Sequence, residues 1–443
     1  MHAVVLAHLP AGQEPLAKLA ALLRGALEGA GYNSLAWFDL ASMKLAYCQG
    51  EFDCWVTTPG RCRSKDAEQD IIAEVHKADA LVTIGPVVFG AHGYALKRAI
   101  DRLICLLSPF FEKRAQLTHH GHRYERHASL YCVGYQPHED VAQAQTFRGL
   151  ADANGLNLLA PAVGATVVHG EPCAAWADEL RELLASRTAP GDSIESRAKL
   201  REELWRSARA AALPDAPAPK RAAFLIGSAK PKGTSTSEHI ARSLARRLEV
   251  HSIEVEFHYA TEFVRDDEPA HESAAALAAA DLLVLASPLY VDALPALATH
   301  ALEQVAKART TRQIDGARMV AVINCGFPEA EHNRTALRVT RHFAEAAGYG
   351  WSGGLPLGGG GAIAGRSLDD PSGPALHVAK SLELAALALS TSKVIPDEAI
   401  EAMAKAPFPD LLYRLLGDLG WRVQAYQHGL PQRALVRRPL EDQ

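Results

Sequence analysis

The chain has 443 residues, of which 48% are apolar and 22% charged, and 46 Lys and Arg against 51 Asp and Glu give a formal net charge of −5. This composition excludes a disordered chain, a collagen-like fibre and a disulfide-stapled mini-protein. The nearly balanced charge gives no sign of nucleic-acid binding, and no apolar run approaches the roughly 20 residues that span a bilayer. The first residues, MHAVVLAHLP, lack the features of a signal peptide, so we expect a cytoplasmic protein without a membrane partner.

One pattern of strands and helices occurs twice along the chain. An apolar first strand starts at Ala3 (AVVLAHL) and again at Ala222 (AAFLIGS). A later strand starts with Ala-Asp and breaks at a proline, at Ala78 (ADALVTIGPVVFG) and at Ala280 (ADLLVLASPLYVD). Continuous apolar strands that alternate with helices are typical of a parallel sheet covered on both faces. The sequence therefore predicts two α/β domains with doubly wound sheets.

The spacing of these elements predicts the domain boundaries. We place the first domain at 1–187 and the second at 220–395. Between them, 188–219 contains a charged helix (AKLREELWRSARA) and the segment PDAPAPK, whose Pro and Ala suit a semi-rigid linker. The remainder, 396–443, is predicted to be a helical tail that docks through Trp421.

A cysteine-rich insertion distinguishes the first copy from the second. The segment YCQGEFDCWVTTPGRC carries Cys48, Cys54 and Cys62, and it has no counterpart in the second copy. Without an export signal, we expect the seven cysteines of the chain to be reduced thiols or metal ligands. Three thiolates hold zinc or an iron–sulfur cluster only with a fourth ligand, and Glu51 stands where a cysteine would complete a cluster. A metal site and a structural or thiol-redox loop both remain open.

Two other groups of potential ligands lie outside this insertion. Residues 119–127 (HHGHRYERH) contain four histidines without a carboxylate or cysteine at helical ligand spacing. We predict a solvated loop between a helix and a strand, or contact with an anionic ligand, rather than a metal site. Cys105, Cys132 and Cys325 are predicted to be ordinary buried residues.

The segment GSAKPKGTSTSEHIARSLARRL, from Gly227 to Leu248, joins a buried strand to an amphipathic helix that begins near Ser237. A loop that brings backbone N–H groups and hydroxyls to a helix N-terminus is suited to bind an anion. Its many hydroxyls and few glycines suit a dianionic monoester phosphate. The loop matches neither the Walker A nor the GxGxxG pattern, so a dinucleotide is a less favoured ligand. The alternative is an ordinary helix cap in a polar loop. The candidate phosphate ligands are Ser228, Lys230, Thr234, Ser235, Thr236 and Ser237.

Together these motifs resemble the NADPH-dependent FMN reductase family of flavodoxin-like proteins. The family's phosphate loop has the pattern G-S-x-R-x-x-S-x-S, which here is GSAKPKGTSTS with Lys230 at the arginine position. The first copy also carries the family's L-K-x-x-x-D-R motif from Leu96, and its insertion resembles that of iron–sulfur flavoproteins. The family's third strand ends in a P-V/L-Y motif that lies along the flavin ring, and the corresponding residues here are Pro288, Leu289, Tyr290 and Val291.

This resemblance implies two flavodoxin-like domains with strand order 2-1-3-4-5, FMN as cofactor and NAD(P)H as co-substrate. It also implies that backbone amides near the pyrimidine edge of the flavin come from Asn324, Cys325, Gly326 and the glycine run around Gly359. For that glycine run, a flexible loop is an equally good interpretation.

The first loop of copy one, AHLPAGQEPLAKLA, departs from the family pattern. It has no Ser or Thr between Ala7 and Lys18, and Glu14 would repel a phosphate, so we expect copy one to have lost the cofactor. Family members usually dimerise with the flavin near the interface. The resemblance therefore implies an intramolecular pseudo-dimer with one FMN per chain, and a homodimer of chains is also compatible with it.

The sequence thus favours an FMN-dependent NAD(P)H oxidoreductase that passes hydride from the nicotinamide to the flavin and on to a small acceptor such as a quinone or free flavin. Because the flavin supplies the redox chemistry, no catalytic side chain is required, and we identify none. The alternative is a non-enzymatic flavodoxin-like electron carrier, possibly of iron–sulfur flavoprotein type. Such carriers are typically small and strongly acidic, whereas this chain is large and nearly neutral.

Overall fold

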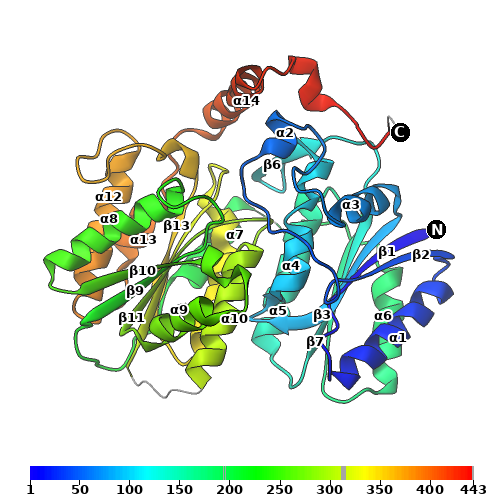
Figure 1. Cartoon of the computed structure of the whole chain (residues 1–443), viewed down its shortest axis with the longest axis horizontal. Coiled ribbons are helices and arrows are strands. Elements are labelled where there is room, and N and C mark those ends of the chain that lie inside the picture. The colour runs from blue at the N-terminus through cyan, green and yellow to red at the C-terminus, as the bar shows by residue number, and fades with distance from the viewer. Residues whose placement is uncertain (193, 195, 311–315, 442–443) are drawn as a thin grey trace. The chain divides into compact units, whose positions relative to one another are not determined.

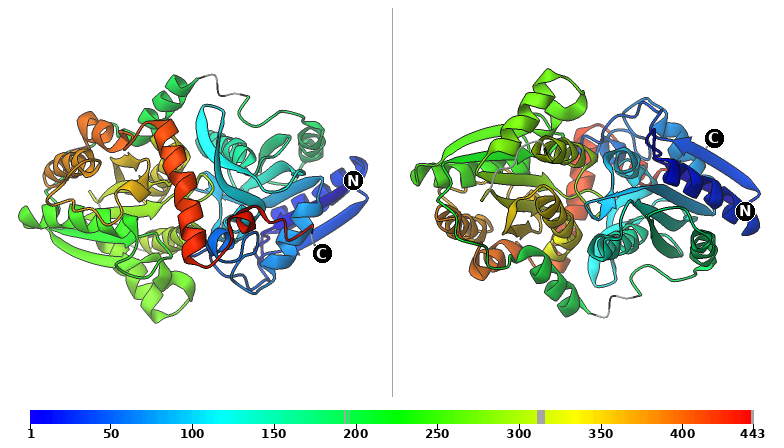
Figure 2. Two further views of the ribbon diagram at one scale, coloured as in Figure 1. Left: turned by 90° about the horizontal axis from the view of Figure 1, so that it is seen from above. Right: turned by 90° about the horizontal axis from the view of Figure 1, so that it is seen from below.

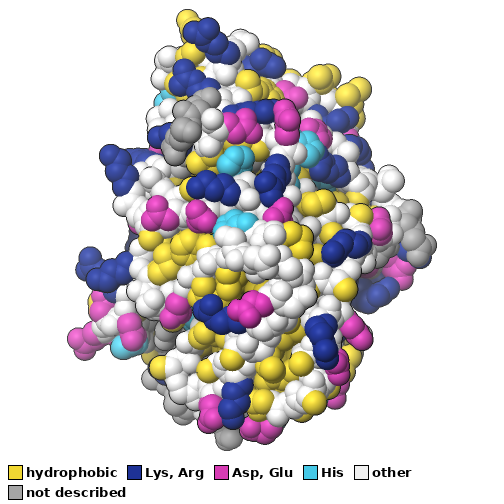
Figure 3. Space-filling model, turned by 90° about the vertical axis from the view of Figure 1, so that its right-hand side faces the viewer, with side chains coloured by type: hydrophobic (Ala, Val, Ile, Leu, Met, Phe, Trp, Pro, Cys, Tyr) yellow, Lys and Arg dark blue, Asp and Glu magenta, His cyan; other side chains and the backbone are white. Residues whose placement is uncertain are grey.

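The computed structural model of the chain describes residues 1–192, 194, 196–310 and 316–441 (Figure 1). It divides into two compact units: unit 1 comprises Met1–Glu195 and Arg414–Gln443, and unit 2 comprises Ser196–Tyr413. Residues 193 and 195 of the predicted linker lie outside the described residues. On the face drawn in Figure 3, basic and acidic side chains are interspersed. Within the described ranges, no helix combines the length and the apolarity that crossing a membrane requires.

Unit 1 is built on a five-stranded parallel sheet with helices on both faces (Figures 1 and 2). In spatial order its strands are β2 (Ser34–Asp39), β1 (His2–Ala7), β3 (Ala80–Val88), β7 (Ser129–Gln136) and β8 (Val163–His169). A two-residue strand, β4 (Ala91–His92), pairs antiparallel with the end of β3. The helices are α1 (Glu14–Gly29), α2 (Asp53–Val56), α3 (Glu68–Lys77), α4 (Tyr94–Ile100), η1 (Leu103–Leu106), α5 (Val141–Asn157) and α6 (Ala174–Ala185).

Alternation along β1 explains why both faces of this sheet are covered. Val4 and Leu6 pack into one core, which includes residues of α3, α4 and α5. Ala3 and Val5 pack into the opposite core, which includes α1 and α6. Successive side chains of a strand point to opposite faces, so a strand that is apolar at every position needs helices on both sides.

Unit 2 repeats this arrangement. Its parallel strands, in spatial order, are β10 (Glu254–Tyr259), β9 (Arg221–Ile226), β11 (Leu282–Pro288), β12 (Arg318–Asn324) and β13 (Gly350–Leu357). Its helices are α7 (Arg197–Ala208), α8 (Thr236–Val250), η2 (Ala260–Val264), α9 (Glu268–Ala279), α10 (Ala296–Thr310), η3 (Ala330–Asn333), α11 (Arg334–Ala346), η4 (Gly360–Ala362), α12 (Ala375–Leu389) and α13 (Asp397–Ala404). Helix α7, from the predicted linker, packs on α11, and α13, from the predicted tail, packs on α12 and β13.

Counted within each unit, both strand orders are 2-1-3-4-5. This confirms the predicted fold class, two doubly wound flavodoxin-like sheets. The units also share a detail beyond strand order, because the third strand of each ends in a tight turn with two successive left-handed residues. In unit 1 these are Phe89 (φ 52°) and Gly90 (φ 78°), and in unit 2 they are Val291 (φ 43°) and Asp292 (φ 58°). An origin by tandem duplication stays a prediction.

The histidine-rich segment is not the solvated loop that the sequence predicted. It forms much of β6 (Leu117–His122), which pairs antiparallel with β5 (Leu107–Arg114). His119 is buried, and its Nδ1 is 2.9 Å from Asn157 Oδ1. The prediction was wrong for residues 119–122 because the pattern of polar histidines hid a half-buried strand that pairs locally.

The final helix, α14 (Asp410–Gln427), continues into η5 (Gln432–Val436). From Arg414 onward this segment belongs to unit 1, and Figure 2 shows the red helix beside the cyan hairpin of β5 and β6. Asp418 accepts a hydrogen bond from Phe111 N (3.1 Å). The ring of Trp421 meets that of Trp55 edge-on, with centroids 5.2 Å apart. The docking role that the sequence predicted for Trp421 is therefore confirmed.

Two glycines of α14 provide a matched test of this packing. An alanine at Gly420 would meet no atom within 4 Å, whereas at Gly417 its Cβ would collide with the ring of Phe111. Each Gly→Ala change gains roughly 1 kcal/mol of helix propensity, but at Gly417 overpacking costs about 1–3 kcal/mol. We expect Gly420→Ala to increase, and Gly417→Ala to decrease or leave unchanged, the hydrogen-exchange protection of the α14 amides. Equal gains in both variants would contradict the packing described.

Candidate functional site

The first candidate site is the N-terminus of α8, directly after β9. Ser235 is the N-cap residue, and its Oγ accepts a hydrogen bond from Glu238 N (3.1 Å). The predicted helix start near Ser237 is therefore confirmed to within one residue. Helix geometry leaves the N–H groups of Thr236 and Ser237 without an intrahelical partner, and we find no other acceptor for them in the described part of the chain. These two donors, with the helix dipole behind them, can bind an anion.

The hydroxyls of this loop have different partners. Thr234 is exposed and donates to Pro231 O (2.7 Å), while the buried Ser237 donates to Asn324 Oδ1 (2.6 Å). The Oγ of buried Ser228 accepts from Lys230 N (3.3 Å), which leaves its hydroxyl proton available. The half-buried hydroxyl of Thr236 has no hydrogen bond within the described residues. Ser228 and Thr236 are thus the hydroxyls best placed to donate to a ligand.

A buried carboxylate holds the loop in shape. Glu238 is 1% exposed, and its Oε2 accepts from Gly233 N (2.6 Å). Its Oε1 accepts from Arg242 Nε (2.9 Å) and Tyr259 OH (2.8 Å). Burial by itself raises the pKa of Glu238, but these donors outweigh burial and hold that pKa below its ordinary value. Sequence analysis did not select Glu238, although its position three residues after a Ser N-cap matches a capping box.

The second part of the site is the turn after β11. Tyr290 and Ala293 exchange backbone hydrogen bonds of 2.9 and 3.1 Å across Val291 and Asp292, both in the left-handed region. Two such residues define a type I′ turn, which costs energy when neither residue is glycine. The turn leaves a half-exposed row at the carboxyl end of the sheet, namely Pro288, Leu289, Tyr290 and Val291. An apolar edge of this kind can cover one face of a planar ring.

Asn324, at the end of β12, connects the two parts. Its side chain accepts from Ser237 in the α8 turn, and its backbone oxygen accepts from Leu289 N (2.9 Å) in the β11 turn. Cys325 is buried, and burial raises the pKa of its thiol to about 12, so it is not a nucleophile at neutral pH. The next residue, Gly326, is exposed, and a Cβ added to it would meet no atom within 4 Å. The structure thus brings three of the predicted segments together at one edge of the unit 2 sheet.

The glycine run after β13 packs closely against other segments of unit 2. A Cβ on Gly358 would collide with the Pro328 carbonyl, and Gly359, at φ 67°, would place one 2.5 Å from Pro407. Gly359 N donates to Phe327 O (2.6 Å). The hydroxyl of Tyr413 donates to Gly326 O (2.7 Å) beside this run. Close packing is enough to explain these glycines, and a role of Gly359 toward a ligand stays a prediction.

Beneath the β11 turn lies a buried polar group that sequence analysis missed. His332 Nδ1 is 3.8 Å from Asp292 Oδ1, and His332 Nε2 is 3.8 Å from Glu329 Oε2. All three side chains are at most 3% exposed. They connect the strained turn to the segment after β12, which supports the position of Tyr290. No sequence signal indicated the group, because Asp292 lies far along the chain from the other two residues.

The corresponding loop of unit 1 lacks these features. Helix α1 begins at Glu14 after the N-cap Gln13, which makes no side-chain capping bond. Glu14 pairs with Lys18 at the surface (2.8 Å). No hydroxyl side chain lies between Ala7 and Lys18 to donate to an anion. These facts agree with the expected loss of a phosphate site in copy one, which stays a prediction.

The cysteine insertion of unit 1 gains no support as a metal centre. Among the residues that the structure describes, no three His, Cys, Asp or Glu side chains are grouped so that they could hold a metal ion, Cys48, Cys54 and Cys62 included.

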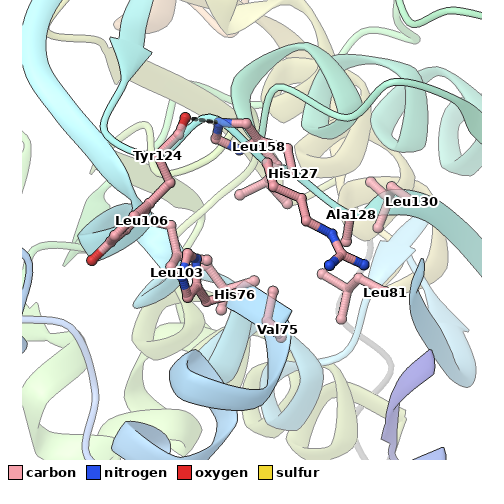
Figure 4. Close-up of a pocket in the computed structure, with 11 residues that line it drawn as sticks. Val75, His76, Leu81, Leu103, Leu106, Tyr124, His127, Ala128, Leu130 and Leu158 are labelled. Carbon is pink, nitrogen blue, oxygen red and sulfur yellow. Dashed lines mark hydrogen bonds between the residues drawn. The ribbon is translucent and has the colours of Figure 1, made fainter. Parts of the chain in front are cut away.

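A small cavity of unit 1 is lined in part by η1, and Figure 4 shows its lining. Leu103 and Leu106 of η1, His76 of α3, and Tyr124 and His127 contribute to the wall. His127 Nε2 donates to the Tyr124 carbonyl (3.0 Å). The volume of about 20 Å³ accommodates one water and excludes a flavin or nicotinamide.

Comparisons with known proteins match a family model to part of unit 2. Residues 221–349 match the model of the family described as NADPH-dependent FMN reductase. For this part of the chain, the match confirms the resemblance that its motifs indicated. Residues 221–349 are therefore similar to a domain of that family. No curated protein sequence matches the chain.

Several solved structures are similar to part of this chain at low identity. An FMN-dependent NADH-azoreductase from Bacillus anthracis is 14% identical, with 39% of this chain and 99% of that chain covered and a TM-score of 0.30. An NAD(P)H:quinone oxidoreductase from Methanothermobacter marburgensis is 14% identical, with 39% and 98% covered and a TM-score of 0.29. A flavodoxin from Streptococcus pneumoniae is 16% identical, with 38% and 97% covered and a TM-score of 0.27. At these values the similarity carries no argument about activity.

The lowered pKa of Glu238 predicts that the loop before α8 loses stability in acid. Because its folded pKa is depressed, its contribution to stability is complete above its unfolded pKa of about 4.3 and is lost as pH falls through the folded pKa. We expect the free energy of unfolding of Glu238→Gln to lie below that of the wild type at neutral pH, and the difference to shrink as the pH falls below about 4. Denaturant unfolding at several pH values measures this difference. Glu249→Gln, exposed on the same helix, is the control, and a difference for Glu238→Gln that does not change with pH would contradict the ionised role.

Proposed function

We propose that unit 2 binds FMN and uses it to transfer hydride from NAD(P)H to a small acceptor such as a quinone or a free flavin. The observation that carries this proposal is the hydrogen-bonded connection, through Asn324, between an anion-binding helix terminus and a half-exposed apolar edge. A flavin mononucleotide has the same two parts, a phosphate and a planar ring. The match of residues 221–349 to the FMN reductase family supports the same ligand.

The residues present fit the phosphate end of FMN. The N–H groups of Thr236 and Ser237 lack other partners, and the hydroxyls of Ser228 and Thr236 can donate. Lys232 is already engaged, since its Nζ is 3.2 Å from Glu262 and 4.1 Å from the centroid of the Tyr259 ring. Lys230 is half-exposed, so it is the cation of the loop that can approach a dianion.

The residues at the β11 turn fit the ring end. Pro288, Leu289 and Tyr290 present apolar surface that excludes water from one ring face. The strained turn and the buried Asp292–His332 contact hold Tyr290 in place. FMN, when bound, supplies the hydride-accepting and hydride-donating centre. The chain's own residues bind and orient the cofactor and exclude water, so the chemistry requires no general base from them.

The first prediction from this proposed function concerns cofactor content and turnover. We expect purified protein to bind one FMN per chain, to lose its visible flavin absorbance on addition of NADPH, and to oxidise NADPH continuously when a quinone is present. Absorbance of the released flavin measures the stoichiometry, and NADPH consumption measures turnover. Two FMN per chain would show that copy one also binds. Reduction without catalytic NADPH consumption would instead favour the electron-carrier alternative.

The second prediction concerns the phosphate site. Removing both donor hydroxyls in Ser228→Ala/Thr236→Ala should weaken FMN binding by about tenfold or more for each charge-assisted hydrogen bond lost, since each contributes roughly 1.5–3 kcal/mol. Fluorescence titration of the apoprotein with FMN measures the Kd. The control is Ser243→Ala, in the same helix, where the buried serine contacts Arg247 (2.5 Å) and not the loop. An unchanged Kd in the double variant would count against the site.

A further inference from the structure

Residues 405–413 pack beside the unit 2 site from outside the segment that matches the family. They run from the end of α13 into the first turn of α14, whereas the match ends at residue 349. A Cβ added to Gly359 would come within 2.5 Å of Pro407 and 3.1 Å of the Tyr413 ring. Both side chains therefore lie directly against the loop after β13, at the carboxyl edge of the sheet.

An ion pair restrains the helix turn that carries Tyr413. Asp410 Oδ2 is 2.8 Å from Arg197 Nη1, and Arg197 Nε is 3.5 Å from Glu331 Oε1. Glu331 lies in η3, after β12, and is 3% exposed, so it gives Arg197 a fixed partner. Residues three apart in a helix are neighbours on its surface. The contact at Asp410 therefore also restrains Tyr413.

The hydroxyl of Tyr413 holds the peptide group that follows Gly326. It donates to Gly326 O (2.7 Å), and burial raises the pKa of Tyr413, so the hydroxyl keeps its proton. On the other side of Gly326, the Gly360 N–H donates to Cys325 O (2.9 Å). Because peptide groups are planar, these two bonds set the orientation of both peptide groups that flank Gly326.

Gly326 depends on these two bonds because it has no side chain to pack. It is exposed, and the space where a Cβ would stand is open. Glycine has the widest backbone freedom of all residues. In the part of the chain that the structure describes, its N–H has no acceptor. The bonds from Tyr413 and Gly360 therefore keep this free donor in a fixed direction.

The Gly326 N–H lies beside the apolar edge that fits a ring. Asn324, two residues earlier, is the register partner of Pro288, and its backbone oxygen accepts from Leu289 N (2.9 Å). Neighbouring strands are about 4.8 Å apart, so the loops after β11 and β12 are adjacent. A tricyclic ring that covers Pro288 and Leu289 is longer than this spacing and reaches the loop that carries Gly326.

From this geometry we propose that Tyr413 is a positioning residue of the flavin site, which holds Gly326 so that its N–H donates to the pyrimidine edge of the ring. This inference rests on the proposed function. The pyrimidine edge carries carbonyl oxygens and gains negative charge when the flavin is reduced, and a fixed N–H stabilises that charge without reorganisation. Without the Tyr413 hydroxyl, rotation of the next peptide group would bring the Gly326 carbonyl toward the same oxygens, which it repels.

Titration of the full-length apoprotein with two flavins tests this role. Riboflavin has the ring of FMN but no phosphate, so it reports on the ring end alone. Tyr413→Phe keeps the aromatic ring and loses the hydroxyl. We expect it to weaken FMN and riboflavin by the same factor, roughly five- to tenfold, because Gly326 must then be ordered on binding. Ser228→Ala/Thr236→Ala should weaken FMN and leave riboflavin unchanged.

Two further variants control for a general effect of the substitution. Tyr349→Phe removes another hydroxyl of unit 2, which donates to Leu277 O (3.0 Å), and should bind both flavins as the wild type does. Asp410→Asn removes the charge that pairs with Arg197. It should weaken both flavins in the same way as Tyr413→Phe but by a smaller factor, and it decides alone if Tyr413→Phe does not fold.

The reduction potential of bound FMN separates positioning from a purely structural role. A loop that is merely loosened weakens the oxidised and the reduced cofactor by the same factor, which leaves the potential unchanged. If the Gly326 N–H acts on the charge of the reduced ring, Tyr413→Phe should weaken reduced FMN more than oxidised FMN, so the potential becomes more negative. Spectroscopic titration against a reference dye measures it, and Tyr349→Phe should keep the wild-type potential.

Two results would overturn this inference and leave the proposed function intact. One is a folded variant at Tyr413 or Asp410 that binds both flavins as tightly as the wild type. The other is an equal loss for oxidised and reduced FMN with an unchanged potential, which would show that the hydroxyl only supports the loop. A wild type that binds neither flavin would instead reject the proposed function, and the inference with it.

Discussion

Asn324 makes the hydrogen bonds on which the geometry of the unit 2 site depends. Its side-chain oxygen accepts from Ser237 in the first turn of α8, and its backbone oxygen accepts from Leu289 in the turn after β11. Because Ser237 and Asn324 are nearly fully buried, neither group can exchange its partner for water without cost. This contact keeps the anion-binding N–H groups at a set position from the apolar edge. A ligand with a phosphate and a ring meets both only if this spacing is kept.

The two units show how one sheet topology carries different loops. Both have the strand order 2-1-3-4-5, and both end the third strand in a turn with two left-handed residues. In unit 2 the loop after the first strand supplies free N–H and hydroxyl donors, whereas in unit 1 the equivalent loop has no hydroxyl and begins its helix with Glu14. Unit 1 instead carries an insertion whose Cys62 is held against Arg102. The units therefore differ mainly in the loops at the carboxyl ends of the strands, where ligands bind in doubly wound sheets, while the strand order is the same.

The outcome for individual residues shows where sequence reasoning was ambiguous. A helix cap and an anion site were alternatives for the hydroxyl-rich loop, and the structure contains elements of both. Ser235 caps α8, and Thr234 closes a local turn, while Ser228 and Thr236 retain protons that they can donate. Residue type alone cannot assign these roles, because a serine that caps and a serine that binds a ligand have the same local sequence. The prediction of a solvated loop for the histidine segment was wrong for a related reason. A short strand that pairs with a neighbouring strand does not need alternating apolar residues, so its sequence gave no sign of it.

By itself, the sequence determined the two parallel sheets, their helical cover and the start of α8. These features follow from local periodicity, from proline and glycine positions and from hydroxyl caps, all of which act over a few residues. Only the tertiary structure decided that Asn324 joins Ser237 to Leu289, that His332 lies between Asp292 and Glu329, and that Arg102 lies against Cys62. Such contacts join residues that lie far apart in the sequence, and their geometry depends on how complete layers pack. Local sequence patterns do not predict this packing, because the same residues at the same spacing are compatible with other arrangements of the helices and strands.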